Sequence, residues 1–311
     1  MVVRFEKHCM FCSASCTPPD DVRGRYVLVS NVWNEERQIH LMFERVARQT
    51  WKPMAWVFMD DGSVDGTYDA ILRGSRQNRS IPVWVERMPP KTKPNFFTLG
   101  RTHEIILGKL RARIDELHVD YMAILDADTE PCPNYFARLC NVLDENPDLG
   151  AVSGEPIEEP GSRIAGQPMN SGKLIRWSVV RSIGEYWDFC PDTFYNIKAL
   201  ANGYRLKVMR VPVHLTRPTT SQSPQGVFRQ GRLAYYAGRP FAGVLLRSIR
   251  RLVLRQHGTE MLRGYLSEVR RGTWRCTDQD VLRFYARDSI PLPRILKTGT
   301  IMPRRSTSQH D

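Results

Sequence analysis

The stretch YMAILDADTEPCP, residues 121–133, places two aspartates one residue apart directly after an apolar run. A short apolar run that ends in polar residues is typical of a buried β-strand. Asp126 and Asp128 are therefore either polar residues of a surface turn or ligands of a bound group. The segments before and after this stretch distinguish the two interpretations.

Apolar runs alternate with amphipathic segments along the first two-thirds of the chain. We expect strands over residues 25–30, 54–60, 81–86, 120–126, 149–154 and 204–214. Helices are expected over residues 35–49, 102–117, 134–146, 172–182 and 192–202, with another that starts at residue 67. This order predicts an α/β fold with a mostly parallel sheet flanked by helices.

Three polar clusters follow expected strands: NVWNEE (31–36), DDGS (60–63) and DAD (126–128). In parallel sheets, ligands bind beyond the carboxyl ends of the strands. The three clusters should meet at one such edge, which predicts a ligand site there.

The net charge of the 311 residues is +12, and all of it lies near the C-terminus. From Arg217 to Asp311 there are 18 Lys and Arg against 6 Asp and Glu, whereas the first 216 residues hold 27 of each sign. We therefore expect a neutral body over 22–216 and a basic α-helical extension over 217–311. The extension suits phosphates on an anionic membrane surface, a lipid-linked substrate or a nucleic acid, unless it is an ordinary solvated surface.

The N-terminal residues 1–21 read as a separate tail that contains cysteines. His8, Cys9, Cys12 and Cys16 either form a metal site or belong to a mobile segment, and the seven cysteines do not suggest a disulfide framework. No run approaches the length of a membrane-spanning helix, and no signal-peptide core is visible. A cytoplasmic protein is expected, with peripheral contact to the cytoplasmic membrane face as a further expectation.

The D-x-D pattern itself suggests a divalent metal. Mg²⁺ and Mn²⁺ prefer oxygen ligands and are often held by one or two carboxylates together with substrate phosphates. The alternative is an Asx-rich turn that caps the helix starting near Pro133.

Two segments together resemble a known family: YVLVSNVWNEERQIHLMFERVARQTWKPMAWVFMDDGSVDGTYDAI (26–71) and YMAILDADTEPCPNYFARL (121–139). The order N-E, Q-T, D-D-G-S-x-D-G-T and D-x-D is similar to that of the family 2 glycosyltransferases of GT-A fold, over roughly residues 25–215. The resemblance implies an inverting, hexosyltransferase-type enzyme. Its donor would be a UDP- or GDP-type sugar, its cofactor Mn²⁺ or Mg²⁺, and its acceptor a glycan or a lipid-linked group.

The resemblance also implies a nucleotide-sugar pocket. The turn with Asn31, Asn34 and Glu35 would line it, Asp61 would hydrogen-bond the base, and Gly62 would let the backbone approach. Asp65 is expected to cap the next helix. Lys93 and Arg101 are candidates for the phosphates, as is Arg229, with Arg232 beside it.

The family's catalytic base corresponds to Asp192 in IGEYWDFCPDTFYNIKALANGYRL (183–206). Pro191 replaces the glutamate that usually precedes this aspartate, so Glu185 or Asp188 would take over part of that role. The alternative is that Asp192 caps its own helix.

Asp126 and Asp128 would hold the metal, Asp126 would also contact the donor, and His214 at a strand end is the third candidate ligand. The absence of Q-x-x-R-W argues against a processive polymerase.

Other classes of protein are less consistent with the sequence. A non-catalytic sugar-nucleotide or glycan-binding module on the same fold is favoured only by Pro191. A nucleotidyltransferase would carry a Gly-rich basic loop after the first strand, where NVWNEE stands. No nucleic-acid partner is expected, because the arginines are not interleaved with an aromatic stacking platform.

Overall fold

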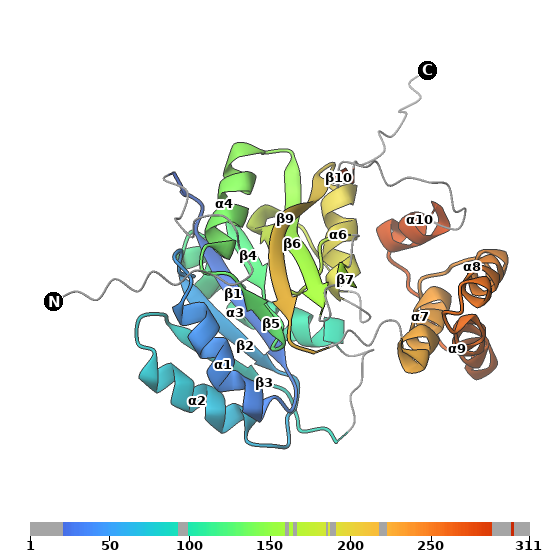
Figure 1. The fold of residues 1–311 in the computed structure, drawn as a ribbon, viewed down its shortest axis with the longest axis horizontal. Coiled ribbons are helices and arrows are strands. Elements are labelled where there is room, and N and C mark those ends of the chain that lie inside the picture. Colours follow the sequence, from blue (N-terminus) through green and yellow to red (C-terminus); the bar gives the residue numbers. More distant parts are fainter. Residues whose placement is uncertain are drawn as a thin grey trace. The chain divides into compact units, whose positions relative to one another are not determined.

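The computed structural model describes residues 21–92, 99–158, 162–163, 167–184, 186, 191–217, 223–287 and 300–301 (Figure 1). They divide into two compact units. Unit 1 takes the described residues up to Arg217 together with Thr300–Ile301, and unit 2 takes those between Pro218 and Ile295. Several residues singled out above lie outside the described residues: His8, Cys9, Cys12, Cys16, Lys93, Glu185 and Asp188.

Unit 1 is built on one mixed sheet, in which the strand order is β10-β9-β6-β8-β4-β1-β2-β3. These strands are β1 (Tyr26–Val32), β2 (Ala55–Asp60), β3 (Val83–Arg87), β4 (Tyr121–Ile124), β6 (Leu149–Glu158), β8 (Lys173–Arg176), β9 (Arg205–Leu215) and β10 (Thr300–Ile301). Two short strands flank this path: β5 (Thr129–Pro131) pairs with β9, and β7 (Ser162–Arg163) pairs with β6. Because β1 pairs in parallel with β2 and β4, and β2 with β3, their carboxyl ends share one edge.

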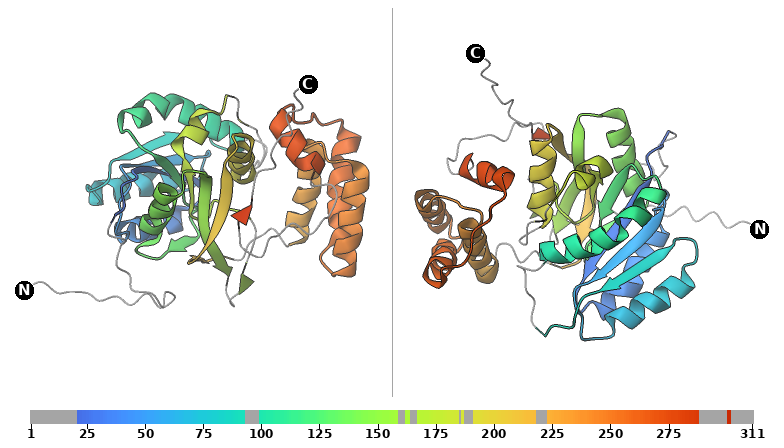
Figure 2. Two further views of the ribbon diagram at one scale, coloured as in Figure 1. Left: turned by 90° about the horizontal axis from the view of Figure 1, so that it is seen from above. Right: turned by 180° about the vertical axis from the view of Figure 1, so that it is seen from behind.

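Helices cover both faces of the sheet. The helices of unit 1 are α1 (Glu36–Ala47), α2 (Thr67–Gln77), α3 (Leu99–Glu116), α4 (Tyr135–Glu145), α5 (Trp177–Arg181) and α6 (Pro191–Ala201). Helices α1, α2 and α4 share one hydrophobic cluster with side chains such as Leu28, Trp56 and Leu174 from alternate positions of the strands. Figures 1 and 2 show α3 on the opposite face from α1 and α2. Cover on both faces explains why β1 and β2 are almost continuously apolar and buried.

One expected helix is wrong in part. Residues 172–182 were expected to be helical, but Lys173–Arg176 form β8, and the helix α5 begins only at Trp177. Strand β8 runs antiparallel between β4 and β6. Pairing on both sides satisfies the backbone of this segment, and this tertiary context overrides a short local pattern that fits either structure.

Unit 2 consists of α7 (Pro224–Tyr236), α8 (Phe241–Val253), α9 (Gly258–Arg271) and α10 (Gln279–Arg287). Its small core contains Val227, Ala234, Tyr235, Val244, Met261 and Tyr265. Thr300–Ile301, which we expected to belong to the C-terminal extension, instead pairs with β9 of unit 1. Within the described parts of the chain, no helix combines the length and apolar character needed to cross a membrane.

A buried histidine joins α3 to α6 in unit 1. His103 is 1% exposed, and its Nδ1 lies 3.0 Å from the hydroxyl oxygen of Tyr195. Burial lowers the pKa of His103 to about 4, because the charged imidazolium loses its hydration.

This histidine predicts acid sensitivity. Since the folded pKa lies below the unfolded value of 6.5, the unfolded state binds the proton more tightly, and stability falls as the pH drops below 6.5. We expect about 3 kcal/mol of unfolding free energy to be lost by pH 4. The free energy of unfolding can be measured by urea denaturation at several pH values across this range. It should fall less steeply with decreasing pH for His103→Gln than for the wild type, whereas the exposed control His40→Gln should follow the wild type. The same dependence on pH in His103→Gln and the wild type would contradict this assignment.

Candidate active site at the carboxyl edge of the sheet

The three polar clusters lie at the ends of neighbouring parallel strands. In register, Val29 of β1 pairs with Ile124 of β4, and Val32 of β1 pairs with Asp60 of β2. Asn31, also on β1, has a buried Oδ1 atom that accepts no hydrogen bond from the described residues. The expected gathering of polar groups at one sheet edge is therefore present.

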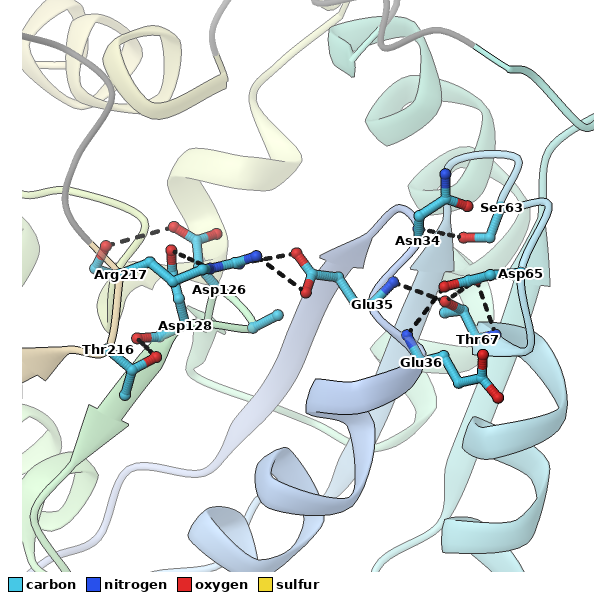
Figure 3. A network of polar contacts seen from close by, with 12 residues as sticks. Asn34, Glu35, Glu36, Ser63, Asp65, Thr67, Asp126, Asp128, Thr216 and Arg217 are labelled. Atoms are coloured by element: carbon cyan, nitrogen blue, oxygen red, sulfur yellow. Dashed lines mark hydrogen bonds and ion pairs between the residues drawn. The ribbon is translucent and has the colours of Figure 1, made fainter. Parts of the chain in front are cut away.

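The turn after β1 is tied to the turn after β2 (Figure 3). Asn34 has a φ of 54°, and its backbone N–H donates to Ser63 Oγ at 2.9 Å. In return, the Val64 N–H donates to Asn34 Oδ1 at 2.9 Å, and the Glu35 N–H donates to Thr67 Oγ1 at 2.7 Å. These reciprocal bonds fix the two turns relative to each other.

Asp65 links the beginnings of α1 and α2, which modifies its expected role as a helix cap. The N-cap residue of α2 is Gly66, and Asp65 stands one position before it. The Asp65 carboxylate accepts the Thr67 N–H at 3.0 Å, the Thr67 hydroxyl and, at 3.3 Å, the Glu36 N–H. Burial raises the pKa of Asp65, but the hydrogen bonds from Thr67 and Glu36 outweigh burial and lower the pKa overall.

Asp61 is 8% exposed, and both of its oxygens have partners. Thr102, in the first turn of α3, donates its hydroxyl to Asp61 Oδ1 at 2.9 Å, and the Lys91 ammonium forms an ion pair with Oδ2. Lys91, which the sequence analysis did not select, thus belongs to the site. A nucleobase that hydrogen-bonds Asp61 would have to share this carboxylate with Lys91.

Gly62 is required by its surroundings. Its φ is +81°, and a Cβ atom there would lie 2.2 Å from the carbonyl oxygen of Pro89. The Lys91 N–H also donates to the Gly62 carbonyl at 2.9 Å. The loop that follows β3 thus lies close against Gly62, and the expected approach of a nucleobase to this glycine stays a prediction.

Arg217 connects the D-x-D segment with the turn after β1 (Figure 3). Its guanidinium donates two hydrogen bonds to the Glu35 carboxylate, at 2.8 and 3.2 Å, and one to Asp128 Oδ2 at 3.3 Å. Burial opposes the charge of Arg217, but the bonds to Glu35 and Asp128 outweigh burial and raise its pKa. Arg217 is the second residue after β9, and the sequence analysis did not select it, because nothing local to it predicts that it meets Glu35.

Asp126 and Asp128 suit a divalent ion in their chemistry. The Asp128 carboxylate already binds a cation, the Arg217 guanidinium, and the Ser171 hydroxyl donates to Asp126 Oδ2 at 3.4 Å. Two carboxylates are a sufficient protein contribution for Mg²⁺ or Mn²⁺ when phosphate oxygens and water complete the coordination. An ion at Asp128 would compete with Arg217 for the same oxygen.

His214 lies on β9, opposite Glu130 of β5 and Ile157 of β6. Nowhere among the described residues do three or more His, Cys, Asp or Glu side chains form a group that would hold a metal ion. Asp126, Asp128 and His214 are therefore not assembled as a three-ligand set, and the role of His214 stays a prediction.

Lys173 is a residue that the sequence analysis missed. It is 0% exposed, and it pairs in register with Ile124 at the end of β4 and with Ser153 of β6. The neighbouring Gly172 N–H donates to the Ile124 carbonyl at 3.1 Å. A fully buried lysine is rare unless its charge is compensated, and Lys173 stands on β8 beside the end of β4, two residues before Asp126. The feature of the sequence that could have identified Lys173 is a single lysine at the start of the apolar run KLI (173–175).

The remaining candidates lie in different parts of the chain. Asp192 is the second residue of α6. Arg101 is an exposed residue of α3, and no hydrogen bond or ion pair within the described residues brings it to the site. Arg229 and Arg232 lie on α7 of unit 2, where Arg232 is paired with the buried Glu268 at 2.5 Å. Burial, followed by the charge of Arg232, lowers the pKa of Arg229.

Comparison with known proteins identifies the fold of unit 1. No protein-family model matches the chain. An uncharacterized glycosyltransferase of Nostoc sp. is 25% identical over 170 residues, which are 54% of this chain and 48% of that protein. The chain thus spans about half the length of this curated relative.

The mannosyltransferase PcManGT from Pyrobaculum calidifontis, solved with GDP-Man and Mn²⁺, matches with a TM-score of 0.52 and 15% identity. The match covers 70% of this chain and 64% of that one. Unit 1 therefore has the GT-A fold of glycosyltransferases, as expected.

Proposed function

We propose that this chain is a family 2 glycosyltransferase that moves a hexosyl group from a nucleotide-diphosphate sugar of UDP or GDP type to an acceptor. The observation that carries the proposal is the edge where Glu35, Asp61 and the pair Asp126 and Asp128 follow three neighbouring parallel strands. The similarity to a Nostoc protein described as an uncharacterized glycosyltransferase, and the fold shared with a mannosyltransferase, support this proposal.

The donor would lie along this edge. The base would bind near Asp61, where Lys91 and Thr102 hold the carboxylate in place. The buried Oδ1 of Asn31 is available to accept a hydrogen bond from the nucleoside. A divalent ion, Mn²⁺ or Mg²⁺, held by Asp126 and Asp128 would supply positive charge to the diphosphate leaving group.

Asp192 is the proposed general base. Its carboxylate would take the proton of the acceptor hydroxyl as that oxygen attacks the anomeric carbon opposite the leaving diphosphate, which inverts the configuration. An acceptor that is already ionised, such as a lipid phosphate, would need no such base. Glycan and lipid-linked acceptors both fit the proposal, and a basic C-terminal region would keep the enzyme at an anionic membrane surface.

The second candidate function is a sugar-nucleotide-binding module without turnover. It is favoured by Pro191, which stands where the family has a glutamate. Donor binding without transfer to any acceptor, at normal affinity and in the presence of metal, would support this module over the enzyme.

Thermal unfolding in the presence of nucleotides tests the donor site. We expect one of UDP, GDP or dTDP, or its sugar conjugate, to stabilise the protein only when Mn²⁺ or Mg²⁺ is present. At 100 times its dissociation constant, the ligand should add about 2.7 kcal/mol to the unfolding free energy. Failure of every nucleotide and nucleotide sugar to raise the melting temperature with metal would reject the proposed function.

A further inference from the structure

Helix α8 of unit 2 exposes an unusual amount of apolar surface. Among the described residues, eleven large apolar side chains are exposed, and nine of them lie in unit 2. Seven belong to α8 and the residue after it: Phe241, Leu245, Leu246, Ile249, Leu252, Val253 and Leu254. Leu246 is 56% exposed and Val253 is 78% exposed. Monomeric soluble proteins rarely leave such residues side by side without a partner.

The exposed apolar residues form one face of the helix. At about 100° per residue, the six from Phe241 to Val253 fall within an arc of about 140°. The helix is attached to its own unit through the buried residues Gly243, Val244 and Ser248. Phe241, at one edge of the arc, also packs against the ring of Tyr265 in the core of unit 2. The other exposed side chains of the arc, from Leu245 to Val253, are not part of that core cluster.

The charge around this apolar face is almost entirely positive. Helix α8 contains Arg247, Arg250 and Arg251 and no acidic residue. Over residues 223–287 there are 13 arginines and no lysine against 4 Asp and Glu, which is a balance of +9. Arg250 is exposed next to the apolar arc, and Arg255 is exposed just beyond the end of the helix.

We infer that α8 docks unit 2 on an anionic lipid surface, with its apolar face inserted between the headgroups and its arginines on the lipid phosphates. An apolar stripe flanked by arginines is the pattern of helices that lie in the plane of a membrane interface. The positive charge selects this occupant, because two copies packed through α8 would bring their arginines together. The inference does not depend on glycosyl transfer.

Sedimentation of the full chain with lipid vesicles tests the inference. The wild type should bind vesicles of phosphatidylcholine and phosphatidylglycerol at least ~10-fold more tightly than phosphatidylcholine alone, because each arginine near the surface adds to the attraction. The double variant Leu246→Gln/Ile249→Gln should lose about 10-fold or more in partitioning, because it removes two of the inserting side chains. Arg250→Gln/Arg255→Gln should reduce the preference for the anionic lipid.

The matched control is Met54→Gln/Val64→Gln, which changes two exposed apolar residues of unit 1 and should partition like the wild type. All the variants should keep the wild-type melting temperature, since the changed side chains are exposed. Equal binding by the Leu246/Ile249 variant and the wild type would overturn the inference. So would a dimer that this variant dissociates, combined with no binding to anionic vesicles, because a second copy would then cover the face.

Discussion

An Asp192→Asn variant should bind the nucleotide sugar as tightly as the wild type and transfer it about 10²- to 10⁴-fold more slowly. Asparagine keeps the size of the side chain but cannot accept the acceptor's proton, so only the chemical step is affected. The measurement is single-turnover transfer to the acceptor, alongside donor affinity from the ligand-dependent melting temperature.

A loss of activity in Asp192→Asn has a competing explanation in the position of Asp192 in the first turn of α6. An acidic residue at that position of a helix stabilises the helix through its dipole. Asp69 is the acidic residue in the first turn of α2, so Asp69→Asn removes the same charge from an equivalent place. Asp69→Asn should lose a little stability and keep the wild-type rate of transfer. Turnover of Asp192→Asn within a few-fold of the wild type would remove Asp192 as the base and leave it a structural residue.

Replacing Asp128 by alanine should abolish the metal-dependent part of nucleotide binding. The wild type is expected to gain about 2.7 kcal/mol from nucleotide at 100 times its dissociation constant with Mn²⁺, and the variant should gain nothing that depends on metal. Without ligand, the variant should unfold within ~1 kcal/mol of the wild type, because Arg217 is 46% exposed and keeps both bonds to Glu35.

Glu130 supplies the matched control. It lies two residues after Asp128, its side chain is 40% exposed, and it pairs with Arg48 at 3.3 Å. Glu130→Ala should therefore keep the metal-dependent stabilisation in full. If Asp128→Ala also retained the metal-dependent stabilisation, the D-x-D pair would not bind the metal. The cation held by Asp128 would then be the guanidinium of Arg217.

Much of the candidate site was predictable because strands β1, β2 and β4 are almost continuous buried apolar runs, each followed by polar residues. A run that is buried on both faces implies a covered parallel sheet, and parallel strands bring their carboxyl ends together. That logic was enough to place Asn34, Asp61 and Asp126 at one edge. It failed at Lys173–Arg176, where a four-residue strand and the start of a helix have the same local pattern.

By itself, the sequence determined the fold class, the edge that carries the polar residues and the identity of the D-x-D pair, because these depend on local periodicity and on strand direction. Only the tertiary structure decided which charges meet. Arg217 reaches Glu35 across 182 positions of the chain, and Lys91 pairs with Asp61 across a strand crossover. The fully buried Lys173 and the apolar face of α8 likewise became visible only with the strand order and the packing of unit 2. Such contacts depend on how distant segments pack, a relation that no short stretch of sequence encodes.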